Sequence, residues 1–180
     1  RDDPASLKAA FVAAASKADV LISSGGVSVG EADFTKQIMQ ELGDVGFWKI
    51  AMRPGRPMAF GMLKPVDESG RKTLFFGLPG NPVAVMVTFY QFVRSALLQL
   101  NGASQTEQLM TQAIAEVPIR KKPGRTEFQR AVMGRGPDGK PMVKLTGSQG
   151  AGILRSMSEA NCFVILPHDQ GNVAAGDWVD

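Results

Sequence analysis

Hydrophobic positions in the first half of the chain alternate between short apolar runs and helical periods of about 3.6 residues. Asp3-Pro4 is typical of a helix start and predicts a helix from Ala5 to about Lys17. Further helices are predicted at 33–42 and 83–100, and strands at 18–23, 47–52, 57–63 and 73–76. This alternation predicts an α/β domain whose sheet is largely parallel and covered by helices.

The pattern changes after Gly102, where a polar segment at 103–112 has the composition of a linker. Beyond it, apolar and polar residues alternate with a period of two, which predicts strands at 114–119, 127–133, 142–145, 163–166 and 178–179. Asp138-Gly139 predicts a hairpin turn between two of these strands. We therefore predict a small β-barrel domain at 104–180, after an α/β domain at 1–103.

Composition argues against several classes of function. The chain has 180 residues, a net charge of +3, one cysteine and one histidine. A single cysteine excludes an internal disulfide and fits a reducing compartment, so we expect a cytoplasmic protein. No apolar run approaches the roughly 20 residues that span a bilayer, and the charge is too small to indicate nucleic acid. Cys162 is interpreted as a buried structural thiol and His168 as a surface residue, which leaves no histidine-based metal site.

The segment SGGVSVGEAD, residues 24–33, lies between an apolar run at 20–22 and a predicted helix. Small residues let backbone N–H groups approach an anion, and a helix N-terminus favours negative charge. Asp33, at the end of this segment, either caps the helix or holds a divalent cation beside a phosphate, and both interpretations stay open. The pattern favours a phosphorylated ligand together with a divalent cation.

Two further segments carry candidate chemistry. Lys49 and Arg53 lie four residues apart, and strand alternation predicts them on one face beside Pro54-Gly55, with Arg56 close by. Such cations suit an oxyanion, and the alternative is a solvated strand edge. The segment Leu78–Pro82 is rigid because it contains two prolines, and it is either purely structural or brings a second helix N-terminus to the strand ends. For the basic run 120–125 and Arg130, a solvated face is the default interpretation.

Four motifs are SGGVSVGEADFTK, FWKIAMRPGRPMAFG, FFGLPGNPVAV and PGRTEFQRA, which cover nearly the whole chain in this order. In sequence and order they resemble the C-terminal part of a MoeA-type molybdopterin molybdenumtransferase. The resemblance implies a three-layer α/β domain shared with MogA-like molybdopterin-binding proteins, followed by a small β-barrel. It also implies that molybdate is inserted into adenylated molybdopterin with release of AMP, and that Mg²⁺ takes part. The implied partners are a MogA-like adenylyltransferase and molybdenum enzymes, and the implied assembly is a homodimer.

By motif, the resemblance implies catalytic roles for Asp33 and Asp2, with Asp33 also holding the metal ion. It places Lys49 and Arg53 near the substrate pocket and Arg130 on the barrel, facing the cleft. Ala151 stands where the family more often has serine or threonine, so a hydroxyl contact is lost or is supplied by Ser148. The implied substrate-binding positions are Ser24, Gly25, Gly26, Ser28, Gly30, Glu31, Lys49, Arg53, Pro79, Gly80, Asn81, Pro82 and Arg130.

The resemblance also defines what the chain lacks. The family's α/β module begins with a strand and a Thr-Gly-Asp-Glu loop, and neither these nor the N-terminal domains are found here. We therefore interpret the chain as a fragment, inactive by itself, in which an intermolecular contact hides the face left by the missing strand.

Two other functions stay open. A MogA-like adenylyltransferase would use the same α/β module, although that module acts without a barrel. A gephyrin-like scaffold would bind a partner peptide between the α/β and barrel domains, and a hydrophobic groove there would favour it. The choice between molybdenum and tungsten also stays open.

Overall fold

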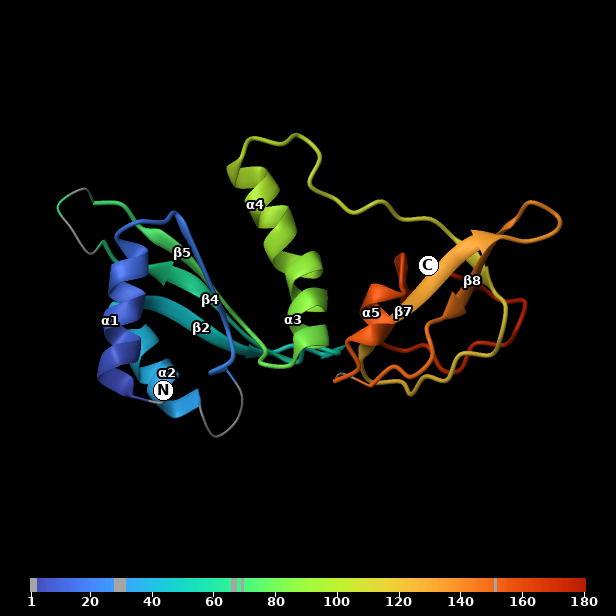
Figure 1. Cartoon of the computed structure of the whole chain (residues 1–180), viewed down its shortest axis with the longest axis horizontal. Helices are drawn as coiled ribbons and strands as arrows, with labels where there is room; N and C mark the ends of the chain where they lie inside the picture. Colours follow the sequence, from blue (N-terminus) through green and yellow to red (C-terminus); the bar gives the residue numbers. More distant parts are fainter. Residues whose placement is uncertain (1–2, 28–31, 66–67, 69, 151) are drawn as a thin grey trace. The chain divides into compact units, whose positions relative to one another are not determined.

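The computed structural model describes residues 3–27, 32–65, 68, 70–150 and 152–180. The chain forms two compact units (Figure 1). Unit 1 consists of residues 1–50 and 55–81, and unit 2 consists of residues 51–54 and 82–180. The two units are defined by contacts between residues. They do not decide the predicted domain boundary between residues 103 and 104, which stays a prediction.

Unit 1 contains a four-stranded sheet with the order β1-β5-β4-β2. Its strands are β1 (Val20–Ser24), β2 (Gly43–Lys49), β4 (Pro57–Leu63) and β5 (Thr73–Leu78). Only the β1–β5 pair is parallel, whereas β4 pairs antiparallel with both β5 and β2. The prediction of a largely parallel sheet was therefore wrong. The reason is that short connections without a helix link β2, β4 and β5, and a parallel pair needs a longer crossover.

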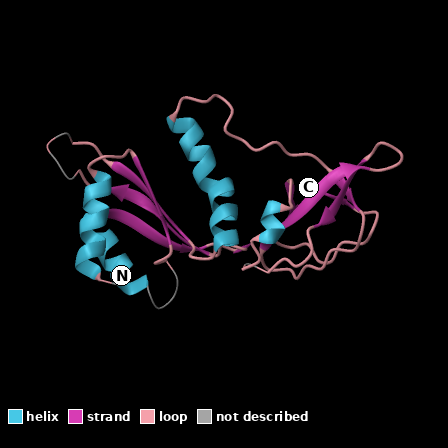
Figure 2. Cartoon of the chain, in the orientation of Figure 1, coloured by secondary structure: helices cyan, strands magenta, loops and turns pink. Residues whose placement is uncertain are grey.

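Helices α1 (Pro4–Ala15) and α2 (Ala32–Leu42) lie together beside this sheet (Figure 2). Asp3 caps α1 by accepting a hydrogen bond from the Ser6 N–H at 2.9 Å, which confirms the predicted helix start. Phe11 of α1 meets Phe75 of β5 edge-to-face, with ring centroids 5.8 Å apart. The described residues of unit 1 include buried Thr35 and Thr73 but no buried charged side chain. Its hydrophobic core contains Phe11, Ala15, Val27, Ile38, Met39, Val45, Ala59, Leu63 and Phe75.

Unit 2 contains a sheet with the order β10-β6-β8-β7-β3, and β9 pairs with β7 outside that path. The strands are β3 (Met52–Arg53), β6 (Ala113–Ala115), β7 (Thr126–Arg135), β8 (Pro141–Leu145), β9 (Cys162–Leu166) and β10 (Trp178–Val179), with a short helix α5 (Arg155–Ser158). Long strand β7 pairs with β8, β9 and β3 in turn, so the sheet bends into a partial barrel. The predicted hairpin at Asp138-Gly139 connects β7 to β8, with Gly139 at φ 79°.

Unit 2 begins with a continuous helix made of α3 (Pro82–Thr88), a π-helical turn η1 (Phe89–Val93) and α4 (Arg94–Leu100). This helix of 19 residues has a mean hydropathy of 1.4 and is long and apolar enough to cross a membrane. The expectation that no apolar run approaches bilayer length was therefore wrong. Because core helices of soluble proteins meet the same criterion, length and composition alone assign no membrane location.

Candidate functional site

The glycine loop and the LPGNP loop of unit 1 lie side by side. Strands β1 and β5 are parallel and end together, with Ser24 opposite Leu78 in the register. The Gly25 N–H donates to the Leu78 carbonyl at 3.0 Å, and the Ser24 hydroxyl donates to the Pro79 carbonyl at 3.3 Å. The structure therefore brings Ser24 and Gly25 close to Pro79 and Gly80 at the ends of β1 and β5, where ligands of open α/β sheets bind.

The loop after β1 depends on glycine. Gly25 and Gly26 have φ values of 91° and 70°, a region that other residues rarely adopt. A Cβ atom on Gly26 would lie only 2.8 Å from the Thr35 hydroxyl of α2. A Cβ atom on Gly80 would lie 3.5 Å from the Gly25 Cα, which shows how closely the two loops approach. Because these three positions are glycines, they place no side chain at the point where the two loops meet.

Several predicted positions fall outside the described residues, namely Asp2, Ser28, Gly30, Glu31 and Ala151. Asp33 is the second residue of α2 rather than its N-cap, and its side chain also lies outside what the structure describes. Within the described part of the chain, no group of three or more His, Cys, Asp and Glu side chains is arranged to hold a metal ion. The metal role of Asp33 therefore stays a prediction.

Lys49 and Arg53 do not share a strand face, so that prediction was wrong. Lys49 ends β2 in unit 1, whereas Arg53 belongs to β3 in unit 2. The strand predicted at 47–52 is interrupted because residues 51–54 join the other sheet, where β3 pairs parallel with β7 and Arg53 lies opposite Glu127. The Ile50 N–H donates to the Arg56 carbonyl at 2.8 Å, so a hydrogen bond joins residues on either side of this segment.

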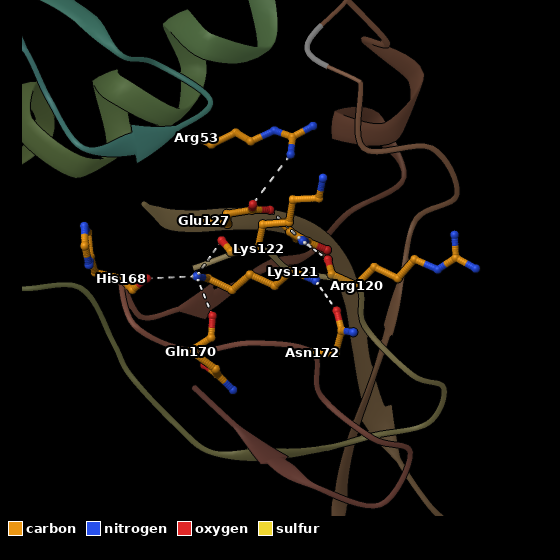
Figure 3. A network of polar contacts seen from close by, with 9 residues as sticks. Arg53, Arg120, Lys121, Lys122, Glu127, His168, Gln170 and Asn172 are labelled. Carbon is orange, nitrogen blue, oxygen red and sulfur yellow. Dashed lines mark hydrogen bonds and ion pairs between the residues drawn. The ribbon is translucent and has the colours of Figure 1, made fainter. Parts of the chain in front are cut away.

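A cavity of about 400 Å³ in unit 2 brings two predicted residues together. Arg53 and Arg130 both line it, and the other polar lining residues are Arg120, Glu127, Gln129 and Gln149. The Arg53 Nη1 atom lies 3.6 Å from the Glu127 Oε1 atom, and the Gln129 amide donates to Glu127 Oε2 at 2.9 Å (Figure 3). Glu127 is only 6% exposed, so these partners replace part of the water that an exposed carboxylate would contact.

Arg130 is the most deeply buried cation of the cavity, with 1% of its surface exposed. Its guanidinium donates to the Ser156 hydroxyl at 3.0 Å and to the Gly150 and Ser148 carbonyls at 3.1 and 3.4 Å. Burial lowers the pKa of the Arg130 guanidinium from its ordinary value, but arginine remains charged at neutral pH. Because all these partners are neutral, the buried positive charge lacks a counter-ion among the described residues and favours an anion nearby.

Gln149 also ties its loop to β7. Its side-chain oxygen accepts the Arg130 backbone N–H at 2.8 Å, and its amide donates to the Arg130 carbonyl at 3.0 Å. Together with the guanidinium, these bonds attach both Ser148 and Gly150 to the strand. The structure thus gives Arg130 a second property, the positioning of the loop that follows β8.

Sequence reasoning missed Glu127, Gln129 and Arg120 as site residues. Residues Glu127 to Ala131 of β7 are all buried, although alternation predicts that every second one is exposed. The only indication in the sequence is the density of polar and charged residues between Phe128 and Ala131, and that density alone does not separate a buried network from a solvated face.

A larger cavity of about 560 Å³, also in unit 2, lies between the long helix and the barrel strands. Tyr90 on the helix and Phe163 on β9 line it, with ring centroids 6.1 Å apart. Two donors at its helix side, Gln91 Nε2 and Arg94 Nη1, are buried without a hydrogen-bond partner. The groove is therefore largely apolar with two unpaired donors.

Comparison with known proteins identifies the family. Residues 1–99 match the family model of a probable molybdopterin binding domain, and residues 112–180 match the MoeA C-terminal region, domain IV. The chain belongs to the MoeA family of molybdopterin molybdenumtransferases. It is 44% identical over 179 residues to the molybdopterin molybdenumtransferase of Haemophilus influenzae, covering 99% of this chain and 43% of that protein. It is 32% identical to the gephyrin of Dictyostelium discoideum, covering 96% of this chain and 26% of that protein.

Solved structures agree with this family. A MoeA protein from Pyrococcus horikoshii matches with a TM-score of 0.72 at 30% identity, covering 99% of this chain and 40% of that chain. The expected fold class, a MogA-like α/β domain followed by a barrel domain, is confirmed. The chain spans less than half the length of the H. influenzae relative. The activity of such a whole protein therefore belongs to the proposal that follows.

Proposed function

We propose that this chain supplies part of the substrate site of a molybdopterin molybdenumtransferase, which inserts molybdate into adenylated molybdopterin and releases AMP. The observation that carries the proposal is the cavity of unit 2. Arg53 and Arg130 both line it, and the buried Arg130 has no counter-ion among the described residues. Two guanidinium groups and nearby amides form a site for an oxyanion such as molybdate. The H. influenzae relative at 44% identity and a Nostoc relative at 30% identity are both named molybdopterin molybdenumtransferase.

The residues of the chain contribute mainly binding and charge stabilisation. The backbone N–H groups of the glycine loop and Lys49 at the end of β2 hold phosphate oxygens in unit 1. Arg53 and Arg130 hold the oxyanion in unit 2, where burial strengthens the interaction. These contacts offset the negative charge of the phosphates and of molybdate, which favours their reaction when both are bound.

Mg²⁺ is usually bound through one or two carboxylates together with substrate phosphates rather than by a cage of protein ligands. The position of Asp33 in the sequence, in the first turn of α2 and after the glycine loop, supports that mode of binding. Asp33 would hold the ion with Asp2, and when bound the ion would offset the charge of the phosphates.

The proposal is tested in a chimaera in which this chain replaces the aligned 43% of the H. influenzae relative. We expect AMP release from adenylated molybdopterin and molybdate, and we expect the isolated chain to release none. An Arg53→Met change should raise the molybdate concentration that gives half-maximal turnover. A folded chimaera that binds adenylated molybdopterin but releases no AMP would refute the assignment.

The remaining expectations are part of the same proposal. We propose a cytoplasmic homodimer that receives adenylated molybdopterin from a MogA-like adenylyltransferase and delivers its product to molybdenum enzymes. A MogA-like activity of the chain itself is disfavoured, because residues 112–180 match the MoeA C-terminal region.

A second candidate function is a scaffold that binds a partner peptide. The groove between the long helix and β9 favours it, because Gln91 and Arg94 present unpaired donors beside apolar side chains. A peptide with an acidic side chain next to an aromatic one would suit this groove. Arg94→Met should abolish binding of such a peptide and leave AMP release by the chimaera unchanged, which separates the two functions.

A further inference from the structure

The segment 120–125, which we call the basic loop, concentrates positive charge in unit 2. It carries Arg120, Lys121, Lys122 and Arg125 within six positions, and no acidic residue occurs between positions 117 and 126. Arg120, Lys122 and Arg125 are exposed, and none of them forms an ion pair with a residue that the structure describes. Like charges at this density repel one another, so the loop gains stability when an anion binds.

Lys121 differs from its neighbours because it is buried, with 4% of its surface exposed. Its ammonium donates to three backbone carbonyls, those of Gln170 at 2.9 Å, His168 at 3.3 Å and Lys122 at 3.4 Å (Figure 3). No carboxylate lies within ion-pair distance among the described residues. Burial of an ammonium without a counter-ion is unfavourable, and the carbonyls replace only part of its hydration.

The backbone of the basic loop is fixed at further points. The Lys121 N–H donates to the Asn172 side-chain oxygen at 2.9 Å, and the Gly124 N–H donates to the His168 carbonyl at 2.9 Å. The Gln129 amide donates to the Arg120 carbonyl at 3.2 Å. A charge run that is merely solvated needs no such support. The loop is therefore held in one conformation before any ligand arrives, which lowers the entropy lost on binding.

The basic loop is continuous with the cavity that holds Arg53. Arg120 lines that cavity, and Gln129 links the loop to the Arg53–Glu127 pair because it bonds to both the Arg120 carbonyl and Glu127. The one acidic side chain in this network, Glu127, is buried and already paired with Arg53. Arg53, Arg120, Lys122 and Arg125 are thus exposed, whereas Glu127 is buried.

We propose that the basic loop binds the diphosphate of a phosphorylated small molecule at the mouth of the Arg53 cavity. Arg120, Lys122 and Arg125 contact the phosphate oxygens, and Lys121 is a positioning residue that fixes the loop through the three carbonyls. The loop contains no aromatic side chain on which a base could stack, which favours a small molecule over single-stranded nucleic acid. The inference goes beyond the proposed function, which assigns phosphate oxygens to unit 1 and molybdate to Arg53 and Arg130.

Calorimetric titration of the 180-residue chain with inorganic pyrophosphate tests the contacts. Lys122→Met and Arg125→Met should each weaken binding by about threefold to tenfold, as loss of a charge-assisted contact does. Lys144→Met and Arg135→Met are matched controls, because both residues are exposed cations of unit 2 outside the loop. Their effect should stay below about twofold. Equal losses in loop and control variants would show general charge attraction only and would overturn the proposal.

Other ligands separate the possible sources of the phosphate. ADP should bind about as well as pyrophosphate, and single phosphate should bind more weakly because it contacts fewer of the cations. An oligonucleotide that binds more tightly than pyrophosphate, with the same loss in Lys122→Met, would assign the loop to nucleic acid and overturn the proposal.

Lys121→Ala tests positioning separately from contact. Pyrophosphate affinity should fall about tenfold, and methylammonium, which fits the emptied carbonyl cage, should restore it, whereas tetramethylammonium should not. Amide hydrogen exchange at Gly124 should rise and then fall back in parallel. Unchanged affinity in the folded variant would refute the positioning role. If Lys121→Ala does not fold, the Lys122 and Arg125 variants decide the proposal.

The inference and the proposed function fail differently. If loop and control variants bind pyrophosphate equally well and the chimaera still releases AMP, only the proposed basic-loop site is refuted. Pyrophosphate binding as expected in a chimaera that releases no AMP removes only the transferase assignment.

Discussion

The two units of the molecule handle charge in opposite ways. Unit 1 carries nine Lys and Arg and nine Asp and Glu residues, whereas unit 2 carries eleven and eight, so the whole net charge of +3 belongs to unit 2. The described core of unit 1 is built from apolar side chains. Unit 2 buries Lys121 and Arg130 as well as an apolar cluster, and both cations bond to backbone carbonyls.

This difference separates two kinds of candidate ligand contact. Unit 1 offers backbone N–H groups and small residues, which suit a ligand through shape and dipoles. Unit 2 offers fixed positive charges, which attract an oxyanion and are held in place by polar networks. Changes in the apolar core of unit 1 should therefore act mainly on stability, and changes at the buried cations of unit 2 should act on both stability and anion affinity.

The largest expected effect comes from the apolar core of unit 1. Phe75→Ala removes a ring that is fully buried and packs edge-to-face on Phe11. We expect a loss of about 3–5 kcal/mol in the free energy of unfolding, as for other buried Phe→Ala changes. Denaturant unfolding measures it, and molybdate affinity of the protein that remains folded should not change. A loss below about 1 kcal/mol would contradict a tightly packed core.

Arg130→Met in unit 2 should affect both properties. The change keeps much of the apolar stem but leaves the Ser148 and Gly150 carbonyls without their charged donor. We expect a loss of about 2–4 kcal/mol in stability together with at least about tenfold weaker molybdate binding. Calorimetry measures both quantities. Weaker stability with unchanged molybdate affinity would make Arg130 purely structural and would remove the contrast between the units.

Asp33→Asn tests the metal role with little change to the helix, because asparagine has nearly the same size as aspartate and removes only its charge. In the chimaera we expect adenylated molybdopterin to bind and AMP release to slow at least about tenfold, since the charge that holds Mg²⁺ is gone. Near wild-type turnover at saturating Mg²⁺ would refute the metal role, and loss of folding would show that Asp33 is structural.

The smallest expected effect concerns the cap of α1. Hydrogen bonds from the Ser6 side chain and the Ser6 backbone hold the pKa of Asp3 below its ordinary value. Because the folded pKa is lower, the cap contributes fully above the ordinary carboxyl value and is lost as the pH falls below it. Asp3→Asn should abolish the loss of folding stability at acidic pH that comes from this cap, and helix α1 should still form. Identical thermal unfolding curves of both proteins at neutral and acidic pH would contradict the role of the carboxylate.

Local patterns were sufficient to predict most elements. The strand predicted at 57–63 is β4, Pro57–Leu63, because a short apolar run that begins at a proline and ends before Lys64-Pro65 is typical of a strand. The helix predicted at 33–42 starts one residue earlier, at Ala32, and ends at Leu42. Asn101 and Gly102, with a φ of 78° at Gly102, end the long helix as predicted. In each case, the information lies within a few neighbouring residues.

Long-range pairing could not be predicted in the same way. Nothing in FWKIAMRPGRP marks residues 51–54 as a strand of the other unit, because that assignment depends on pairing with β7 more than seventy residues later. The buried positions of Lys121 and Arg130 were missed for a related reason. A charged residue in an alternating pattern predicts exposure, and only the carbonyls supplied by distant loops make burial tolerable.

The central claim, that unit 2 holds the oxyanion site, is tested most directly by a residue-resolved NMR titration of the chain with molybdate. The account predicts saturable amide shifts at Arg53, Glu127, Gln129 and Arg130, lost in Arg53→Met and preserved in Lys144→Met. Shifts confined to residues of unit 1, or equal in both variants, would contradict the claim.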